Sequence, residues 1–220
     1  METSIINPKL IDEFSKYMEK YNHLYQEIAE MVYYYIVNPL GNPLIVDLGV
    51  GLGHLMEKIY NLIPKARILG LDSSLEMLYA AQKRHQRLKL KNFEGIYSFS
   101  EKIPLKANSV DIVVSRFSLA YWSNPDESFR EILRILKPGG YFLLEALNGD
   151  FPKWKLNLIK IHMGLKSAGN SVIKYHIDAY NSALNIRETV DLLSNAGLKV
   201  ISKRGKKGQW KFILVSQGIL

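Results

Sequence analysis

The feature that most constrains the fold is an apolar run that leads into an acidic, glycine-rich turn. Leu44, Ile45 and Val46 follow one another without polar alternation, which is typical of a strand buried on both faces of a parallel sheet. In the turn that follows, Asp47 to Gly53, glycine recurs at every second position and lets the backbone approach a ligand closely. From His54 the apolar spacing becomes helical. The stretch predicts a strand, a loop and a helix N-terminus, whose free N–H groups can bind a ligand.

The spacing of this turn separates two kinds of nucleotide loop. A dinucleotide-binding loop would read G-x-G-x-x-G, and its third glycine would fall on His54. The chain instead reads Asp-x-Gly-x-Gly-x-Gly, and a second apolar strand, predicted over 67–71, ends on Asp72, 25 positions after Asp47. A carboxylate at that point can accept both hydroxyls of a ribose. The alternative is a generic doubly wound protein in which Asp72 only caps a helix.

These motifs resemble those of the class I S-adenosylmethionine-dependent methyltransferases, of the type related to ubiquinone- and menaquinone-biosynthesis enzymes. The sequence Lys-Pro-Gly-Gly at 137–140, before a later strand, adds to the resemblance, which covers residues 14–147 and, less closely, the last hairpin. It implies a Rossmann-like, doubly wound α/β sheet of seven strands in the order 3-2-1-4-5-7-6, with the seventh strand antiparallel. It also implies methyl transfer, with S-adenosyl-L-methionine as cofactor and S-adenosyl-L-homocysteine as product.

The resemblance assigns each part of the cofactor to a part of this chain. Asp47 and the glycine loop would hold the methionine and sulfonium portion, and Asp72 would hold the ribose. Tyr21 would lie over the methionine end, and Arg116 could meet its carboxylate. The full set of implied cofactor-binding residues is Tyr21, Asp47, Gly49, Val50, Gly51, Gly53, Asp72, Ser73, Met77, Phe99, Ser100, Glu101 and Arg116. Plain core packing is the alternative for Tyr21 and Met77.

The chain departs from the family pattern at two positions. Phe99 stands where many members carry an Asp that accepts a hydrogen bond from the adenine amino group, and a phenyl ring cannot accept that bond. Ala120 and Tyr121 stand where many relatives have two histidines before the Trp, so a histidine base is absent there. We assign no catalytic residue, because a proton-removing side chain is optional when the nucleophile is already an amine, thiolate or enolate.

Residues 151–181 form an insertion with apolar positions at helical spacing and lysines between them. In relatives an insertion at this point acts as a substrate lid, so we expect substrate specificity to reside here. The candidate substrate contacts are Tyr121, Trp122, Trp154, His162 and His176. The alternatives are a solvated helix that covers the sheet and a basic helix that touches a membrane surface.

Charge is distributed unevenly along the chain. Residues 1–150 hold 17 Lys and Arg against 18 Asp and Glu, whereas residues 151–220 hold 12 against 3, a balance of +9. This asymmetry suggests an anionic partner for the last third, with a lysine-rich solubilising surface as the alternative. We therefore expect a small-molecule acceptor that is anionic or amphipathic. The alternative functions are an RNA methyltransferase and a non-catalytic nucleic-acid-binding protein with a retained cofactor fold.

The 220 residues predict a single α/β domain. We divide it into an N-terminal helical cover (1–40), a cofactor-binding core (41–150), the lid insertion (151–181), and the last helix with its hairpin (182–220). The absence of cysteine excludes disulfides, thiolate nucleophiles and Cys-ligated zinc, and we expect no metal. No apolar stretch approaches the ~20 residues that span a bilayer, and the N-terminus does not resemble a signal peptide. We therefore expect a cytoplasmic protein without stable membrane insertion; no sequence feature sets its oligomeric state.

Overall fold

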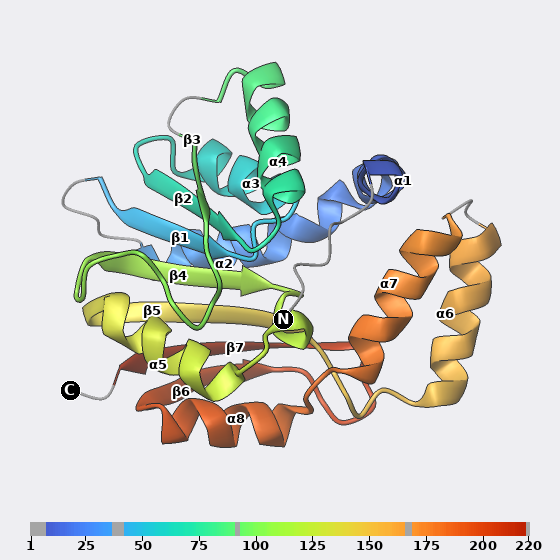
Figure 1. Cartoon of the computed structure of the whole chain (residues 1–220). Coiled ribbons are helices and arrows are strands. Elements are labelled where there is room, and N and C mark those ends of the chain that lie inside the picture. The colour runs from blue at the N-terminus through green and yellow to red at the C-terminus, as the bar shows by residue number, and fades with distance from the viewer. Residues whose placement is uncertain (1–7, 37–41, 91–92, 166–168, 219–220) are drawn as a thin grey trace.

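A seven-stranded sheet in the order β3-β2-β1-β4-β5-β7-β6 forms the centre of the protein (Figure 1). This computed structural model describes residues 8–36, 42–90, 93–165 and 169–218. Strands β1 to β5 are parallel, and β7 lies antiparallel between β5 and β6. The predicted strand order and the antiparallel last strand are confirmed. The strands are β1 (Leu44–Leu48), β2 (Arg67–Asp72), β3 (Phe93–Tyr97), β4 (Val110–Arg116), β5 (Leu136–Leu147), β6 (Leu198–Arg204) and β7 (Lys211–Gly218).

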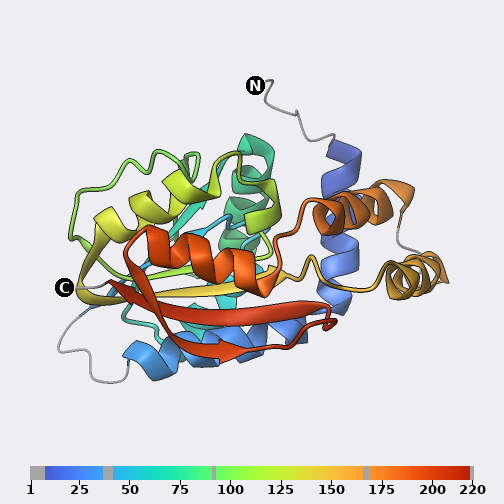
Figure 2. The same cartoon turned by 90° about the horizontal axis from the view of Figure 1, so that it is seen from below.

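Helices cover both faces of the sheet and leave its carboxyl edge to the loops. Helices α2, α3 and α4 pack on one face and α5 and α8 on the other, as Figure 2 shows for α2 against α5 and α8. Because β1 and β4 are buried on both faces, their sequences are nearly continuous apolar runs. The helices are α2 (Gln26–Ile36), α3 (His54–Leu62), α4 (Leu75–Arg87), α5 (Pro125–Ile135) and α8 (Ile186–Asn195).

The N-terminal helical cover predicted over 1–40 is divided in two. Helix α1 (Pro8–Lys20) ends before Tyr21, a 3-10 turn follows at Asn22–Tyr25, and α2 begins at Gln26. The break lets the two helices cover different surfaces. Met18 of α1 packs near the glycine loop, whereas Ile28 of α2 packs into the core beneath the sheet. Residues 37–41, at the end of this cover, lie outside the described residues.

An ion-pair cluster fastens α1 to the core. Arg84 of α4 is 8% exposed, and its guanidinium lies 2.6 Å from Glu57 of α3 and 2.5 Å from Glu19 of α1. We expect Arg84→Met to lower the free energy of unfolding by about 3 kcal/mol, because it leaves a largely buried carboxylate unpaired. Urea unfolding measures this effect. Arg187→Met is the control, because Arg187 is 93% exposed and 3.9 Å from Asp191; equal stability of both variants would contradict the anchoring role.

The predicted insertion forms two helices beside the carboxyl edge of the sheet, α6 (Lys153–Leu165) and α7 (Asn170–Asn181) (Figure 1). Helix α7 packs on α1 and on the 3-10 turn Leu119–Tyr121, and residues 166–168 lie outside the described part. The β6–β7 hairpin tip reaches the same edge, since Leu147 pairs with Lys211. Within the described ranges, no helix is long and apolar enough to cross a membrane.

Candidate active site

The glycine loop lies at the carboxyl end of β1, where the strand order reverses between β1 and β4. Open α/β sheets bind ligands at this switch point. The loop is fastened to the end of β2: the N–H groups of Gly49 and Val50 donate to the Leu71 carbonyl at 2.8 and 3.0 Å. The Gly51 N–H donates to Asp72 Oδ2 at 2.8 Å. The loop and Asp72 therefore form one unit.

Two glycines of the loop are required for different reasons. Gly49 has φ +81°, and a Cβ at this position would lie 2.4 Å from the Cβ of Ser118, so packing excludes any side chain. Gly51 has φ +51°, and its Cβ would meet no protein atom within 4 Å. The space beside Gly51 is open, as expected where a ligand approaches the backbone.

Asp47 and Asp72 act on one another across this loop. Asp47 is 2% exposed, and its Oδ2 has no hydrogen-bond partner in the described part of the chain. Burial and, secondarily, the negative charge of Asp72 raise the pKa of Asp47 to about 8, while the positive charge of Arg116 opposes the shift. Burial also raises the pKa of Asp72, although backbone N–H groups donate to its carboxylate. The two acids are therefore close enough for their charges to interact, and Asp47 carries an unsatisfied oxygen.

The raised pKa predicts how the stability of the unliganded protein depends on pH. Because the folded state holds the Asp47 proton more tightly, this group's stabilisation is complete below pH 4 and is lost as pH rises to about 8. Asp47→Asn removes that loss. We expect the variant to be more stable than the parent by on the order of 2 kcal/mol at pH 8, and by less at pH 5. Urea unfolding across this range measures the difference; parallel pH profiles would contradict the assignment.

A buried ion pair borders the loop on the side of β5. Arg116, at the end of β4, has its Nε 2.5 Å from Glu145 Oε2 of β5. The Arg116 guanidinium also lies 4.0 Å from the ring centroid of Tyr25 and 4.2 Å from that of Phe117. Lys211 forms a second ion pair with Glu145. Arg116 thus lies at the end of β4, but its charge, which was predicted to meet the methionine carboxylate, is already paired with a carboxylate of the protein.

His54, the first residue of α3, is a feature that the sequence analysis missed. Its ring is 1% exposed and stacks on Tyr25, with ring centroids 5.2 Å apart. Neither ring nitrogen has a hydrogen-bond partner among the described residues. Burial lowers the pKa of His54 to about 3, so the imidazole is neutral. Its place directly after the last glycine of the loop was the available signal.

Phe117 is a second missed residue at this edge. Its φ is +57°, which is uncommon for a residue with a side chain. The Phe117 N–H donates to the Glu145 carbonyl at 2.7 Å, and the ring lies 5.6 Å from that of Trp210. Such backbone strain gathers at functional sites. No sequence pattern signals it, because it arises from the packing of the loop.

The residues predicted to contact adenine divide into two groups. Ser73 and Phe99 are exposed, after the ends of β2 and β3. The others are engaged within the protein: Met77 packs with Met18 and Leu52. Ser100 is buried and its Oγ lies 2.9 Å from that of Ser128, while Glu101 Oε1 accepts from the Asn124 N–H at 2.9 Å.

The predicted substrate residues also separate. Tyr121 stacks on Tyr175 of α7, with ring centroids 4.8 Å apart, and Trp122 Nε1 donates to Ser118 Oγ at 3.1 Å, next to the glycine loop. His176 Nδ1 lies 3.0 Å from the Val172 carbonyl in its own helix.

Three further predicted residues lie outside the sheet, Tyr21 between α1 and the 3-10 turn and the other two on α6. The ring of Tyr21 lies 4.9 Å from that of Tyr17, at the end of α1. Trp154 and His162 are exposed on α6, whose packing partner is α7. The structure therefore does not bring Trp154 or His162 to the glycine loop.

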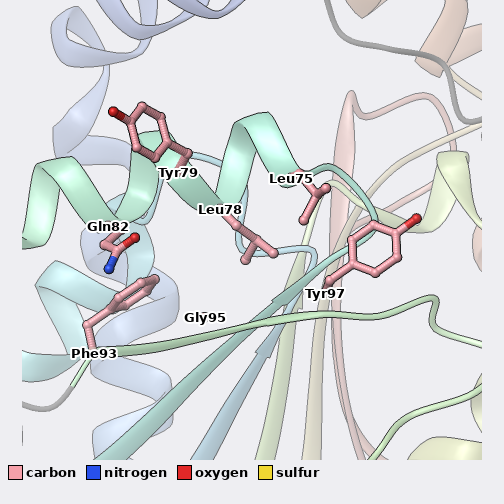
Figure 3. Close-up of a pocket in the computed structure, with 7 residues that line it drawn as sticks. All are labelled: Leu75, Leu78, Tyr79, Gln82, Phe93, Gly95 and Tyr97. Carbon is pink, nitrogen blue, oxygen red and sulfur yellow. The ribbon is translucent and has the colours of Figure 1, made fainter.

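A separate groove of about 370 Å³ lies between α4 and β3. Figure 3 shows Leu75 and Leu78 of α4 pointing toward the strand that carries Phe93 and Tyr97, and Tyr79 also lines the groove. Neither acid of the loop site lines this groove. It lies at the edge of the sheet, since β3 is the terminal strand.

Comparisons with known proteins find similarity to methyltransferases. Residues 46–144 match the family described as "Methyltransferase domain". Over 111 residues the chain is 34% identical to a malonyl-[acyl-carrier protein] O-methyltransferase of Marinomonas sp., covering 50% of this chain and 40% of that protein. Over 165 residues it is 28% identical to a demethylmenaquinone methyltransferase of Chlorobaculum tepidum, covering 71% of this chain and 66% of that protein. The chain thus spans less than two thirds of the length of either relative.

A solved structure shares the fold over most of its length. A SAM-dependent methyltransferase from Aquifex aeolicus superposes with a TM-score of 0.65 at 20% identity, covering 86% of this chain and 88% of that one. The fold, the matched domain and the curated relatives agree with the acidic glycine loop and with Asp72. Residues 46–144 therefore match a methyltransferase domain, the curated relatives are named as methyltransferases, and the chain shares the fold of a SAM-dependent methyltransferase.

Proposed function

We propose that this chain transfers a methyl group from S-adenosylmethionine to a small-molecule acceptor. The observation that carries the proposal is the unit formed by the glycine loop, Asp72 and the unsatisfied oxygen of Asp47. When bound, the cofactor supplies a sulfonium methyl group ready for in-line displacement. The chain's own contribution is to hold the cofactor and to position the acceptor, and positioning can supply about 7–11 kcal/mol at best.

The polar groups of the site fit this cofactor. A carboxylate has about four acceptor positions, and Asp72 uses some of them for the N–H groups of Gly51 and Ser74, with the Ser73 N–H as a further donor. The acceptor positions left over would accept from the ribose hydroxyls. Asp47 Oδ2 would accept from the cationic methionine end, and a positive charge there would lower the pKa of Asp47 again. Gly51 leaves room for the ligand to approach the loop.

The acceptor, we propose, is anionic or amphipathic and enters beneath α7. The stack of Tyr121 on Tyr175 joins α7 to the loop after β4, so α7 lies beside the carboxyl edge as a lid would. The basic hairpin tip, with Lys206 and Lys207, reaches the same edge. The two relatives' names point to a malonyl carrier protein and a demethylmenaquinone as their acceptors. Those names favour a small acceptor group over the RNA alternative.

Transfer of radiolabelled methyl from S-adenosylmethionine tests the proposal. The protein is incubated with a panel that holds a prenylated quinol, a malonyl thioester and total RNA. We expect label in the quinol or the thioester, and none when Asp72→Ala replaces the parent protein. Label in RNA alone would favour the alternative function. Binding of the cofactor without transfer to any member would reject the proposed acceptor class.

A further inference from the structure

Helix α6 carries an apolar stripe on its outer side. Trp154, Leu158, Ile161 and Leu165 are 63%, 57%, 61% and 79% exposed. Their spacing of four, three and four residues places them within an arc of about 60°, given 3.6 residues per turn. We call these four residues the α6 stripe. Figure 1 shows α6 as an outlying helix, on the far side of α7 from the sheet.

The stripe is not needed for folding. The opposite side of α6 supplies the fold contacts, because Leu156 and Met163 are buried and Ile159 packs against a cluster with Val172 and Ile173. Helix α6 therefore has two apolar sides, and among the described residues the fold uses one. Four large apolar side chains in a row on a solvent-facing helix indicate an interaction surface.

Lysines border the stripe on both sides. Lys153 and Lys160 lie along one border and Lys155 along the other, at about 90–130° from the centre of the stripe. Lys155 Nζ lies 5.4 Å from the centroid of the Trp154 ring. The helix Lys153–Leu165 contains no Asp or Glu. The surface is thus apolar in the middle and cationic along its borders.

We propose that α6 binds the surface of an anionic lipid bilayer and lies in its plane. The stripe would enter the boundary between headgroups and acyl chains, and the lysines would meet lipid phosphates. A helix of 13 residues is about 20 Å long and cannot cross the ~30 Å hydrocarbon core. This inference does not depend on methyl transfer, because it rests on the shape and charge of α6 alone.

Charge and shape favour a bilayer over the other possible occupants. Two copies of the chain joined through α6 would place lysine-bordered stripes against each other, which like charges oppose. A protein partner would need an acidic groove shaped to a single outlying helix. A flat anionic surface meets the stripe and both lysine borders at once.

Vesicle co-sedimentation, without cofactor, tests the inference. We expect the protein to bind vesicles of equal phosphatidylglycerol and phosphatidylcholine, and to bind phosphatidylcholine alone at least tenfold more weakly. Leu158→Gln with Ile161→Gln should lower binding to the anionic vesicles at least about tenfold. Lys153→Gln with Lys160→Gln should lower it roughly tenfold or more, and added salt should reproduce that loss.

The matched control replaces one Leu and one Ile elsewhere on the surface. Leu75→Gln with Ile201→Gln alters side chains that are 63% and 45% exposed on α4 and β6, and binding should stay within about twofold. The inference is overturned if the parent protein does not bind anionic vesicles. It is also overturned if the control pair, Leu75→Gln with Ile201→Gln, loses as much binding as the stripe pair, Leu158→Gln with Ile161→Gln. It is also overturned if sedimentation velocity finds a dimer that the stripe pair dissociates. Because the lysine pair alters charge alone, it keeps the test valid should the stripe pair misfold.

Discussion

Replacing Asp72 with alanine is expected to weaken S-adenosylhomocysteine binding about a hundredfold or more. The variant removes the acceptors for two ribose hydroxyls, and hydrogen bonds to a charged group contribute about 1.5–3 kcal/mol each. It also frees the Gly51 N–H, which Asp72 holds at 2.8 Å, and so loosens the loop that faces the methionine end. Isothermal titration calorimetry with the product, which is chemically stable, measures the loss.

Asp111→Asn is the matched control for this variant. Asp111 lies at the opposite edge of the sheet, where its Oδ2 accepts from the Leu44 N–H at 2.9 Å and its carboxylate pairs with Lys137. It is therefore also an aspartate that fastens a backbone amide, but it is remote from the loop. The affinity of the Asp111→Asn variant for S-adenosylhomocysteine should remain within about twofold of that of the parent protein. An unchanged affinity of Asp72→Ala for S-adenosylhomocysteine would contradict the proposal that Asp72 binds the ribose.

Gly51→Ala is expected to keep the protein folded while lowering cofactor affinity at least about tenfold. The added Cβ would meet no protein atom within 4 Å, so the folded state bears only the cost of a left-handed alanine, about 1 kcal/mol. The same methyl group would occupy space that the bound ligand needs. Calorimetry measures the affinity, and thermal unfolding without ligand shows whether the fold is retained.

Gly208→Ala separates backbone strain from obstruction of the site. Gly208 has φ +77°, its Cβ would likewise meet nothing within 4 Å, and it lies at the hairpin tip. The Gly208→Ala variant should lose as much stability as Gly51→Ala but keep the cofactor affinity of the parent protein. If Gly51→Ala binds as tightly as Gly208→Ala, the loop does not approach the ligand and the open space has another cause.

The strand order could be predicted only through the family resemblance, whereas the central strands carry their own signal in the sequence. Strands β1 and β4 are buried on both faces, so their apolar runs stand out in the sequence, and the glycine loop marks the end of β1. The end of α1 before Tyr21 was not visible, because the apolar spacing continues through the 3-10 turn Asn22–Tyr25. Tertiary packing of α1 and α2 on different surfaces causes that break.

Side-chain partners at the site were less predictable than its backbone. The pairing of Arg116 with Glu145 depends on the register between β4 and β5, which places the two residues side by side. The burial of His54 under Tyr25 depends on how the 3-10 turn Asn22–Tyr25 packs on α3. Neither relation is local in the sequence, so spacing alone could not reveal it.

Helix α6 shows a different limit of sequence patterns. Its apolar positions form two stripes on opposite sides, and helical spacing alone does not tell which one faces the protein. The structure buries Leu156 and Met163 and leaves Trp154 and Leu158 outside. The neighbouring helix α7 determines which apolar side of α6 is buried, because it packs on one side of α6 only.

We propose that the glycine loop, Asp47 and Asp72 form one pocket for a sulfonium nucleoside. A crystal structure of the complex with S-adenosylhomocysteine tests this proposal. We predict both ribose hydroxyls within hydrogen-bond distance of the Asp72 carboxylate, and the amino-acid end against Gly49–Gly53. A nucleoside bound instead in the groove between α4 and β3 (Figure 3), without contact to either acid, would contradict it.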